Sequence, residues 1–213
     1  MPPTVMTIVE GHGEVKALPL LIRRIAHEAG HFDLNLPTPI RCPKSKVIRP
    51  RGELVEAELT RAIHLAANKL PCREEGAILI LYDADEGCPA ELGPRIADLA
   101  HRIRPDIHVG IVLAKSEYEA WFLAAAESLK RAGKLGPEAS PPPDPEDVSD
   151  AKRMLANWMG PAKSYSETVD QPKFTHVFDL EEAKGCKSFA KLLREVEKIL
   201  QKLYPEASRH SRD

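Results

Sequence analysis

Hydrophobic residues along the chain alternate between two patterns. Mainly apolar runs, typical of strands buried on both faces, occupy residues 4–9, 77–85 and 106–114. Apolar residues at helical spacing occupy the segment between Gly13 and Gly30, and then residues 53–70, 89–104 and 117–131. Strands that alternate with helices predict an α/β fold, with a mainly parallel sheet that helices cover on both faces.

The pattern changes where prolines accumulate. Prolines within residues 37–50 predict irregular structure with room for one short strand. After Gly136 the chain reads "GPEASPPPDPEDVSD", an acidic and proline-rich stretch that indicates an exposed loop. Pro145, followed by two acids, predicts a helix that runs to about Met159, and an amphipathic stripe predicts a last helix over residues 189–203.

These segments divide the chain into three predicted parts. Residues 1–132 form the α/β domain, residues 133–147 a proline-rich loop, and residues 148–213 a helical extension packed on the same domain. We expect the tail "ASRHSRD" to be frayed.

Composition narrows the classes of protein. The net charge of −2 excludes the overall positive field of a generic nucleic-acid binder, so any nucleic-acid contact must come from a local basic patch. The four cysteines form no C-x-x-C pair, which argues against a structural zinc site and suits reduced thiols. With no signal peptide and no apolar stretch near the roughly 18 residues that span a bilayer, we expect a cytoplasmic protein without membrane contact.

Acidic residues follow two of the predicted strands. "VEGHGE" places Glu10 at the first strand end and Glu14 in the first turn of the helix that follows, and "YDADE" places Asp83 and Asp85 at a later strand end. Ligands of open parallel sheets bind at the carboxyl ends of the strands, so we expect these four carboxylates in one crevice, with the glycines letting the backbone turn sharply. Such carboxylates repel one another unless they keep protons or bind a divalent cation such as Mg²⁺.

These two motifs resemble the signature of the Toprim fold, the catalytic domain of topoisomerases, bacterial-type primases and the overcoming-lysogenization-defect (OLD) nucleases. Glu14 and the "ALPLLI" that follows are most similar to the OLD-type branch. "SEYEAWFLA" and "GCKSFAKLL" resemble a small Toprim-like family that is often associated with ATPases of the OLD or ABC type. The resemblance spans roughly residues 4–203, and it makes residues 1–132 the Toprim-like catalytic domain.

The resemblance implies hydrolysis of phosphodiester bonds with Mg²⁺ or Mn²⁺. Glu10, Asp83 and Asp85 match the shared acids, with Glu10 as general base or metal ligand, and Glu14 matches the extra glutamate of the nuclease branch. Glu117 and Glu119 match an acidic pair at a helix start that completes a second metal position, with Ser116 as helix cap; only one of the two can face the metal. The candidates for a lysine that offsets charge on the phosphate are Lys163, Lys173 and Lys115.

A basic segment offers a surface for nucleic acid. "RCPKSKVIRPRG" carries no acid between its cations, and the candidates for phosphate contacts are Lys44, Lys46, Arg49 and Arg51. A solvated loop is an equal alternative. Trp121 and Phe122 are expected in the core rather than as platforms for bases.

The sequence is compatible with three functions. The first is a nuclease, acting on DNA more than on RNA, in a phage-defence or DNA-processing system with an ABC- or OLD-type ATPase partner. The second is a non-catalytic, metal-binding regulatory subunit of such an ATPase complex. The third is a small-phosphoester hydrolase or phosphotransferase. Strandedness of the substrate and oligomeric state are also open.

Overall fold

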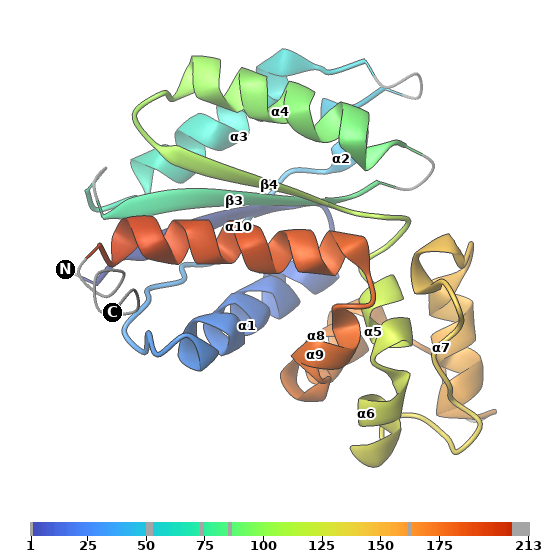
Figure 1. Ribbon diagram of the computed structural model, residues 1–213. Helices are drawn as coiled ribbons and strands as arrows, with labels where there is room; N and C mark the ends of the chain where they lie inside the picture. The colour runs from blue at the N-terminus through green and yellow to red at the C-terminus, as the bar shows by residue number, and fades with distance from the viewer. Residues whose placement is uncertain (1, 50–52, 73–74, 85–86, 162, 206–213) are drawn as a thin grey trace.

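In the part of the chain that the structure describes, four parallel strands form the central sheet (Figure 1). The computed structural model describes residues 2–49, 53–72, 75–84, 87–161 and 163–205. The strands are β1 (Thr4–Val9), β2 (Ile40–Arg41), β3 (Gly76–Asp83) and β4 (His108–Ala114), in the order β2-β1-β3-β4. Every neighbouring pair of strands is parallel, so all their carboxyl ends lie at the same end of the sheet.

Helices cover both faces of the sheet, as the alternation of strand and helix predicts. One face carries α2 (Lys44–Val47), α3 (Glu56–Asn68) and α4 (Pro89–Ile103), and the other carries α1 (His12–Glu28) and α10 (Lys187–Leu203) (Figure 1). Alternate strand residues enter the two buried clusters: in β3, Leu79 and Leu81 pack with α1 and α10, whereas Ile78 and Ile80 pack with α3 and α4. The α/β fold with a covered parallel sheet is therefore confirmed.

Further helices gather beyond the carboxyl ends of the strands (Figure 1). They are α5 (Ala120–Ala124), α6 (Ala126–Arg131), α7 (Ala151–Met159), α8 (Glu167–Val177) and α9 (Leu180–Ala183). Their apolar residues continue the cluster that contains α1 and α10. Trp121 and Phe122 are fully buried there, as expected, and Trp121 Nε1 donates to Ser188 Oγ at 2.8 Å.

Two predicted helix starts are corrected. The helix expected over residues 117–131 begins after Glu119 and breaks at Ala125, where ψ is 25°. Ser116 has a left-handed φ of 60° and does not cap this helix, because its hydroxyl donates to the carbonyl of Glu146 at 2.8 Å. The helix expected from Pro145 begins at Ala151 instead, because Asp150 accepts from the Arg153 N–H and caps it; residues 145–147 form one 3-10 turn.

The proline-rich stretch is partly core rather than an exposed loop. Glu146 is only 4% exposed, and its carboxylate accepts from the N–H groups of Lys187 at 3.0 Å and Ser188 at 2.8 Å. These N–H groups begin α10 and lack acceptors within the helix, so a distant carboxylate caps them. The division into residues 1–132, 133–147 and 148–213 remains a prediction, and the expectation of a frayed tail falls largely outside the described residues.

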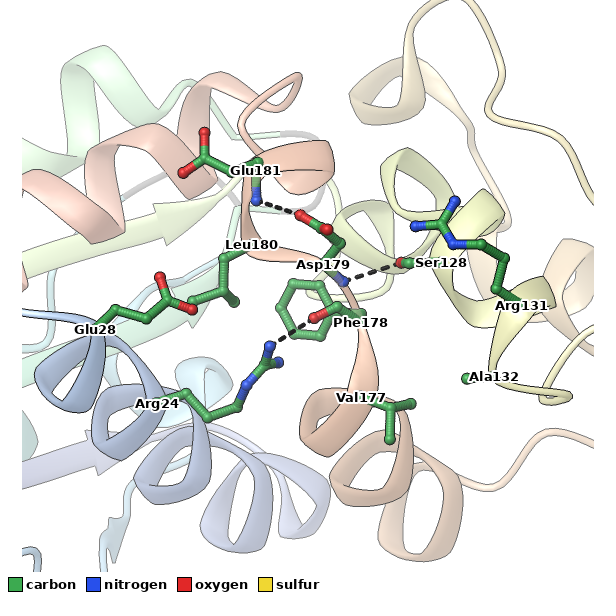
Figure 2. A pocket seen from close by; sticks show the side chains of 10 residues that line it. All are labelled: Arg24, Glu28, Ser128, Arg131, Ala132, Val177, Phe178, Asp179, Leu180 and Glu181. Carbon is green, nitrogen blue, oxygen red and sulfur yellow. Dashed lines mark hydrogen bonds between the residues drawn. The ribbon is translucent and has the colours of Figure 1, made fainter.

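Arg24 attaches α1 to the end of α8 (Figure 2). Its guanidinium donates to the carbonyls of Thr175 and Phe178, both at 2.8 Å, and lies 5.3 Å from the centre of the Phe178 ring. Ser128 of α6 continues this attachment, because its hydroxyl accepts from the N–H of Asp179. These contacts border an open hollow of about 490 Å³ and fix α8 against α1.

Arg24→Met should lower the free energy of unfolding by roughly 2–3 kcal/mol, because two charge-assisted hydrogen bonds to carbonyls are lost. Urea denaturation measures the loss, and Arg23→Met, an exposed change on the same helix, serves as control. Equal effects of the two variants would show that Arg24 does not hold α8.

Candidate functional site

A cavity of about 380 Å³ lies at the carboxyl ends of β1 and β3. Among the described residues, it is lined by Glu10, Gly11, Glu14, Arg41, Pro43, Ser45, Asp83, Glu119, Lys152, Glu167 and Gln171. Five of these side chains are acidic and two are basic. The cavity is therefore strongly anionic at neutral pH unless some carboxyls keep their protons or a cation binds.

Both halves of the chain supply these side chains. Glu10 follows β1, Glu14 lies in the first turn of α1, and Asp83 ends β3. Glu119 precedes α5, while Lys152 comes from α7 and Glu167 begins α8. The ends of the parallel strands thus bring acids together, and the later helices close the cavity around them.

Glycines at the start of α1 give room for close packing. A Cβ at Gly13 would lie 2.9 Å from the carbonyl oxygen of Glu167 and would collide with Gln171. A Cβ at Gly11 would lie 2.5 Å from Glu14 Oε2. Neither glycine has a positive φ, so the bend of the chain at residues 10 and 11 does not itself require glycine, and space for α8 and for Glu14 explains the two glycines.

Asp83 is fixed by its surroundings. Its Oδ1 accepts from the N–H of Tyr118 at 2.9 Å, and its carbonyl accepts from Lys44 Nζ at 2.7 Å. Burial raises the pKa of the Asp83 carboxyl well above its usual range, and the negative charges of Glu119 and Glu14 raise it further.

Glu119 is the most buried acid of the cavity, at 1% exposure. Its Oε1 accepts from the Tyr165 hydroxyl at 2.8 Å and from Gln171 Nε2 at 3.2 Å. Its Oε2 is buried and has no hydrogen-bond partner among the residues that the structure describes. Burial raises the pKa of Glu119 to about 7.

Lys152 lies among these acids and lines the same cavity. Its Nζ lies 2.7 Å from Glu167 Oε1 and 3.5 Å from Glu117 Oε1. Burial alone would lower the pKa of Lys152, but Glu119, Glu167 and Glu117 outweigh it and raise the pKa. Lys152 therefore stays charged and offsets part of the negative charge.

The donor set suits a hard divalent cation. Carboxylate oxygens are its preferred ligands, and the buried Oε2 of Glu119 offers one that the described residues leave unused. Within the described parts of the chain, no three His, Cys, Asp or Glu side chains are arranged to enclose a metal. Mg²⁺ usually takes only one or two carboxylates and keeps several waters, so it does not require such an enclosure.

The structure brings some predicted site residues together and places others elsewhere. Glu10, Glu14, Asp83 and Glu119 share the cavity, and Glu117 reaches it through Lys152. Asp85 lies outside the described residues. Whether these residues bind metal stays a prediction.

The predicted lysines do not line the cavity. Lys163 is exposed, Lys173 lies 3.7 Å from Asp170, and Lys115 pairs with Asp147. Sequence reasoning missed Lys152 and, on α8, Glu167 and Gln171. The only signal for α8 is Ser166 before an acidic first turn, because Pro172 interrupts the segment and its apolar residues lack helical spacing.

The basic segment lies beside the cavity only in part. Arg41 and Ser45 line it, and Lys44 contacts the carbonyl of Asp83. Lys46 is exposed, and Arg49 pairs with the exposed Glu53 at 3.1 Å. Arg51 lies outside the described residues.

Residues 9–197 match the family described as "Domain of unknown function (DUF4276)", and the chain belongs to this family. No curated protein matches it. Among solved structures, it is similar to the C-terminal region of the Burkholderia pseudomallei OLD protein, with 14% identity over 92% of this chain and 98% of that one, and a TM-score of 0.37. A likeness of this extent does not define a common fold. In the described residues, no helix has the length and apolar character needed to cross a membrane.

Because the pKa of Glu119 is raised, we expect the protein to lose stability as pH rises in the presence of a chelator. With a pKa raised from 4.5 to about 7, folded Glu119 keeps its proton where the unfolded chain has lost it. The folded state then binds more protons, so the free energy of unfolding falls with rising pH across this window, by roughly 3 kcal/mol for this group. Urea denaturation between pH 5 and 8 measures the fall.

Glu119→Gln provides the control for this pH dependence, because glutamine can still accept from Tyr165 but does not titrate. The variant should show a flatter profile than the unmodified protein. Parallel profiles would contradict the assigned role of Glu119 in the pH dependence.

Proposed function

We propose that the chain is a Toprim-type, Mg²⁺- or Mn²⁺-dependent nuclease of the cytoplasm that hydrolyses phosphodiester bonds, in DNA rather than RNA. The observation that supports this most is the convergence of Glu10, Glu14, Asp83 and Glu119 on one cavity at the strand ends. An ABC- or OLD-type ATPase partner and a role in phage defence or DNA processing belong to the same proposal.

Binding of a divalent cation would supply charge neutralisation for the phosphate and activation of the attacking water. The chain itself holds the donors in place. The N–H of Tyr118 orients Asp83, while Tyr165 and Gln171 together bind one oxygen of Glu119 and leave the other without a hydrogen-bond partner among the described residues. Glu10, at the end of β1, is the proposed general base or metal ligand.

Lys152 is a better candidate for the assisting lysine than Lys163 or Lys173, which do not line the cavity. It is the only lysine that lines the cavity in the described part of the chain, and it stays charged. We propose that it offsets the negative charge that grows on the phosphate during cleavage. Arg41, which is exposed at the same cavity, and the exposed Lys46 would contact neighbouring phosphates.

One observation favours the non-catalytic alternative. Lys152 already pairs with Glu167 and Glu117, so a protein cation satisfies part of the acidic cluster without a metal. A regulatory subunit of an ATPase complex could use this network for stability alone. The two functions differ in whether the purified chain cleaves nucleic acid.

Asp83→Asn should abolish cleavage of supercoiled plasmid in Mn²⁺, lowering the rate at least about 100-fold, because asparagine loses the negative charge that binds the cation. Its amide oxygen can still accept from the Tyr118 N–H, so the melting temperature should not fall. Asp147→Asn, the same change at an exposed site outside the cavity, should cleave normally.

Three results would count against the nuclease. One is no cleavage by the unmodified protein in Mg²⁺ or Mn²⁺, which favours the regulatory subunit. Another is full activity of Asp83→Asn. The last is turnover of p-nitrophenyl phosphate with intact plasmid, which favours a small-phosphoester hydrolase.

Lys152→Met should lower the rate of cleavage about 100-fold at saturating substrate, because a positive charge near the phosphate is lost. Lys163→Met and Lys173→Met are matched controls that should stay within about two-fold of the unmodified rate. Thermal denaturation checks that all three variants are folded. If Lys173→Met loses activity and Lys152→Met keeps it, the assignment to Lys152 is wrong.

A further inference from the structure

The two edges of the sheet are built differently. The edge at β2 has only two residues, whereas the edge at β4 has seven, with the sequence "HVGIVLA". β4 contains no proline, lysine or acid, the residues with which proteins usually protect an edge strand from pairing with another chain.

A groove of about 650 Å³ runs along this edge between α4 and α10. Its floor is formed by Val109, Ile111 and Leu113 of β4. A second hollow of about 440 Å³ shares Ala97 and Val109 with it, so the groove continues towards the start of the strand. In Figure 1, β4 lies at the edge of the sheet, with α4 on one side and α10 on the other.

The main chain of β4 offers hydrogen-bonding groups to this groove. The carbonyl of Ala114 accepts from the N–H of Ala84, which continues β3. Because main-chain groups of a strand alternate in direction, those of Val109, Ile111 and Leu113 face away from β3 and into the groove. These are the three strand residues that line it, and no described residue hydrogen-bonds to them from another element.

Gly93 keeps the wall formed by α4 low. It lies inside the helix, where glycine is less favourable than alanine, yet a Cβ at this position would meet nothing within 4 Å. Packing within the chain therefore does not require glycine here. Its effect is to leave space in the groove beside the strand.

The opposite wall and the end of the groove carry an excess of positive charge. Lys115, Lys187, Lys191 and Arg194 line it, against the acids Glu146 and Glu195. Glu146 caps α10, Glu195 pairs with Lys191 and Lys198, and Lys115 pairs with Asp147. Lys187 and Arg194 are therefore the two basic side chains of the groove that form no ion pair with a described residue. Arg194 is exposed. The groove therefore suits an acidic ligand.

We propose that this groove binds an extended, acidic segment of another protein, which adds to β4 as a fifth strand. Main-chain groups of Val109, Ile111 and Leu113 pair with the segment. Its acidic side chains contact the exposed Lys187 and Arg194. A second copy of this chain is a poorer occupant, because pairing two β4 edges would bring the two sets of basic side chains together. The proposal is independent of the proposed nuclease activity.

A fluorescein-labelled peptide of about eight residues, alternating valine and glutamate to match the length of β4, serves as the probe. Fluorescence anisotropy should show saturable binding to the full chain. A valine–lysine peptide should bind at least about ten-fold more weakly. The same loss is expected for a valine–glutamate peptide that is N-methylated at every second residue, because it lacks main-chain donors on one edge.

Variants of the protein place the peptide in the groove. Gly93→Leu should weaken binding about ten-fold by filling the groove, while its melting temperature equals or exceeds that of the unmodified protein. Gly93→Ala, the matched control, should show the same change in melting temperature but bind the peptide better than the leucine variant does. Arg194→Glu should weaken binding about ten-fold, whereas Arg23→Glu on α1 should change it less than about two-fold.

Four results would overturn the proposal. In the first, the valine–glutamate peptide does not bind, and in the second its N-methylated form binds equally well. In the third, Gly93→Leu leaves peptide binding unchanged. In the fourth, analytical ultracentrifugation shows a dimer that Gly93→Leu disrupts. The last result would assign the groove to a second copy of the chain. Hydrogen exchange gives a positive check, because the amides of Val109, Ile111 and Leu113 should become protected by the peptide.

Discussion

Repulsion between carboxylates packed at the strand ends is the constraint on which the candidate site depends. Five acidic and two basic side chains of the described residues share one cavity, and the acids cannot all be ionised and buried without a counter-charge. The chain relieves the repulsion in two visible ways. Lys152 stays charged beside Glu167 and Glu117, and the pKa values of Asp83, Glu14 and Glu119 are raised. A divalent cation, if it binds as proposed, would relieve it in a third way and would then link the stability of the fold to occupancy of the site.

Close packing of α8 on α1 makes this cavity possible. Gly13 lets the two helices approach closely, because a Cβ there would lie 2.9 Å from the carbonyl oxygen of Glu167, and Arg24 attaches the far end of α8 to α1. Gln171 and Tyr165 then reach Glu119, so the later segments orient an acid that follows β4. The site is consequently a product of the sheet and of the helices beyond it, and neither half of the chain holds all of its side chains.

The sequence predicts the sheet-borne part of the site because buried parallel strands have an unmistakable apolar pattern, and their ends must meet at one edge. Glu10 and Asp83 could therefore be placed together from the sequence alone, and the structure shows them in the same cavity. α8 and Lys152 could not, because α8 has Pro172 inside it and no apolar stripe, and its position depends on contacts with α1 far away in sequence. Likewise, the acidic segment around Glu146 is typical of a solvent-exposed loop, and nothing in its sequence indicates that the Glu146 carboxylate caps the distant start of α10.

The cavity and the groove along β4 meet at one turn. Lys115 lines the groove, Ser116 donates to the carbonyl of Glu146, and the N–H of Tyr118 holds Asp83. Ser116 adopts a left-handed φ of 60°, which is costly for a residue with a side chain and persists only where its surroundings fix it. A ligand that moved Lys115 or Glu146 would therefore act on the turn that orients Asp83 and carries Glu119. The two sites share no described lining residue, but they share this support.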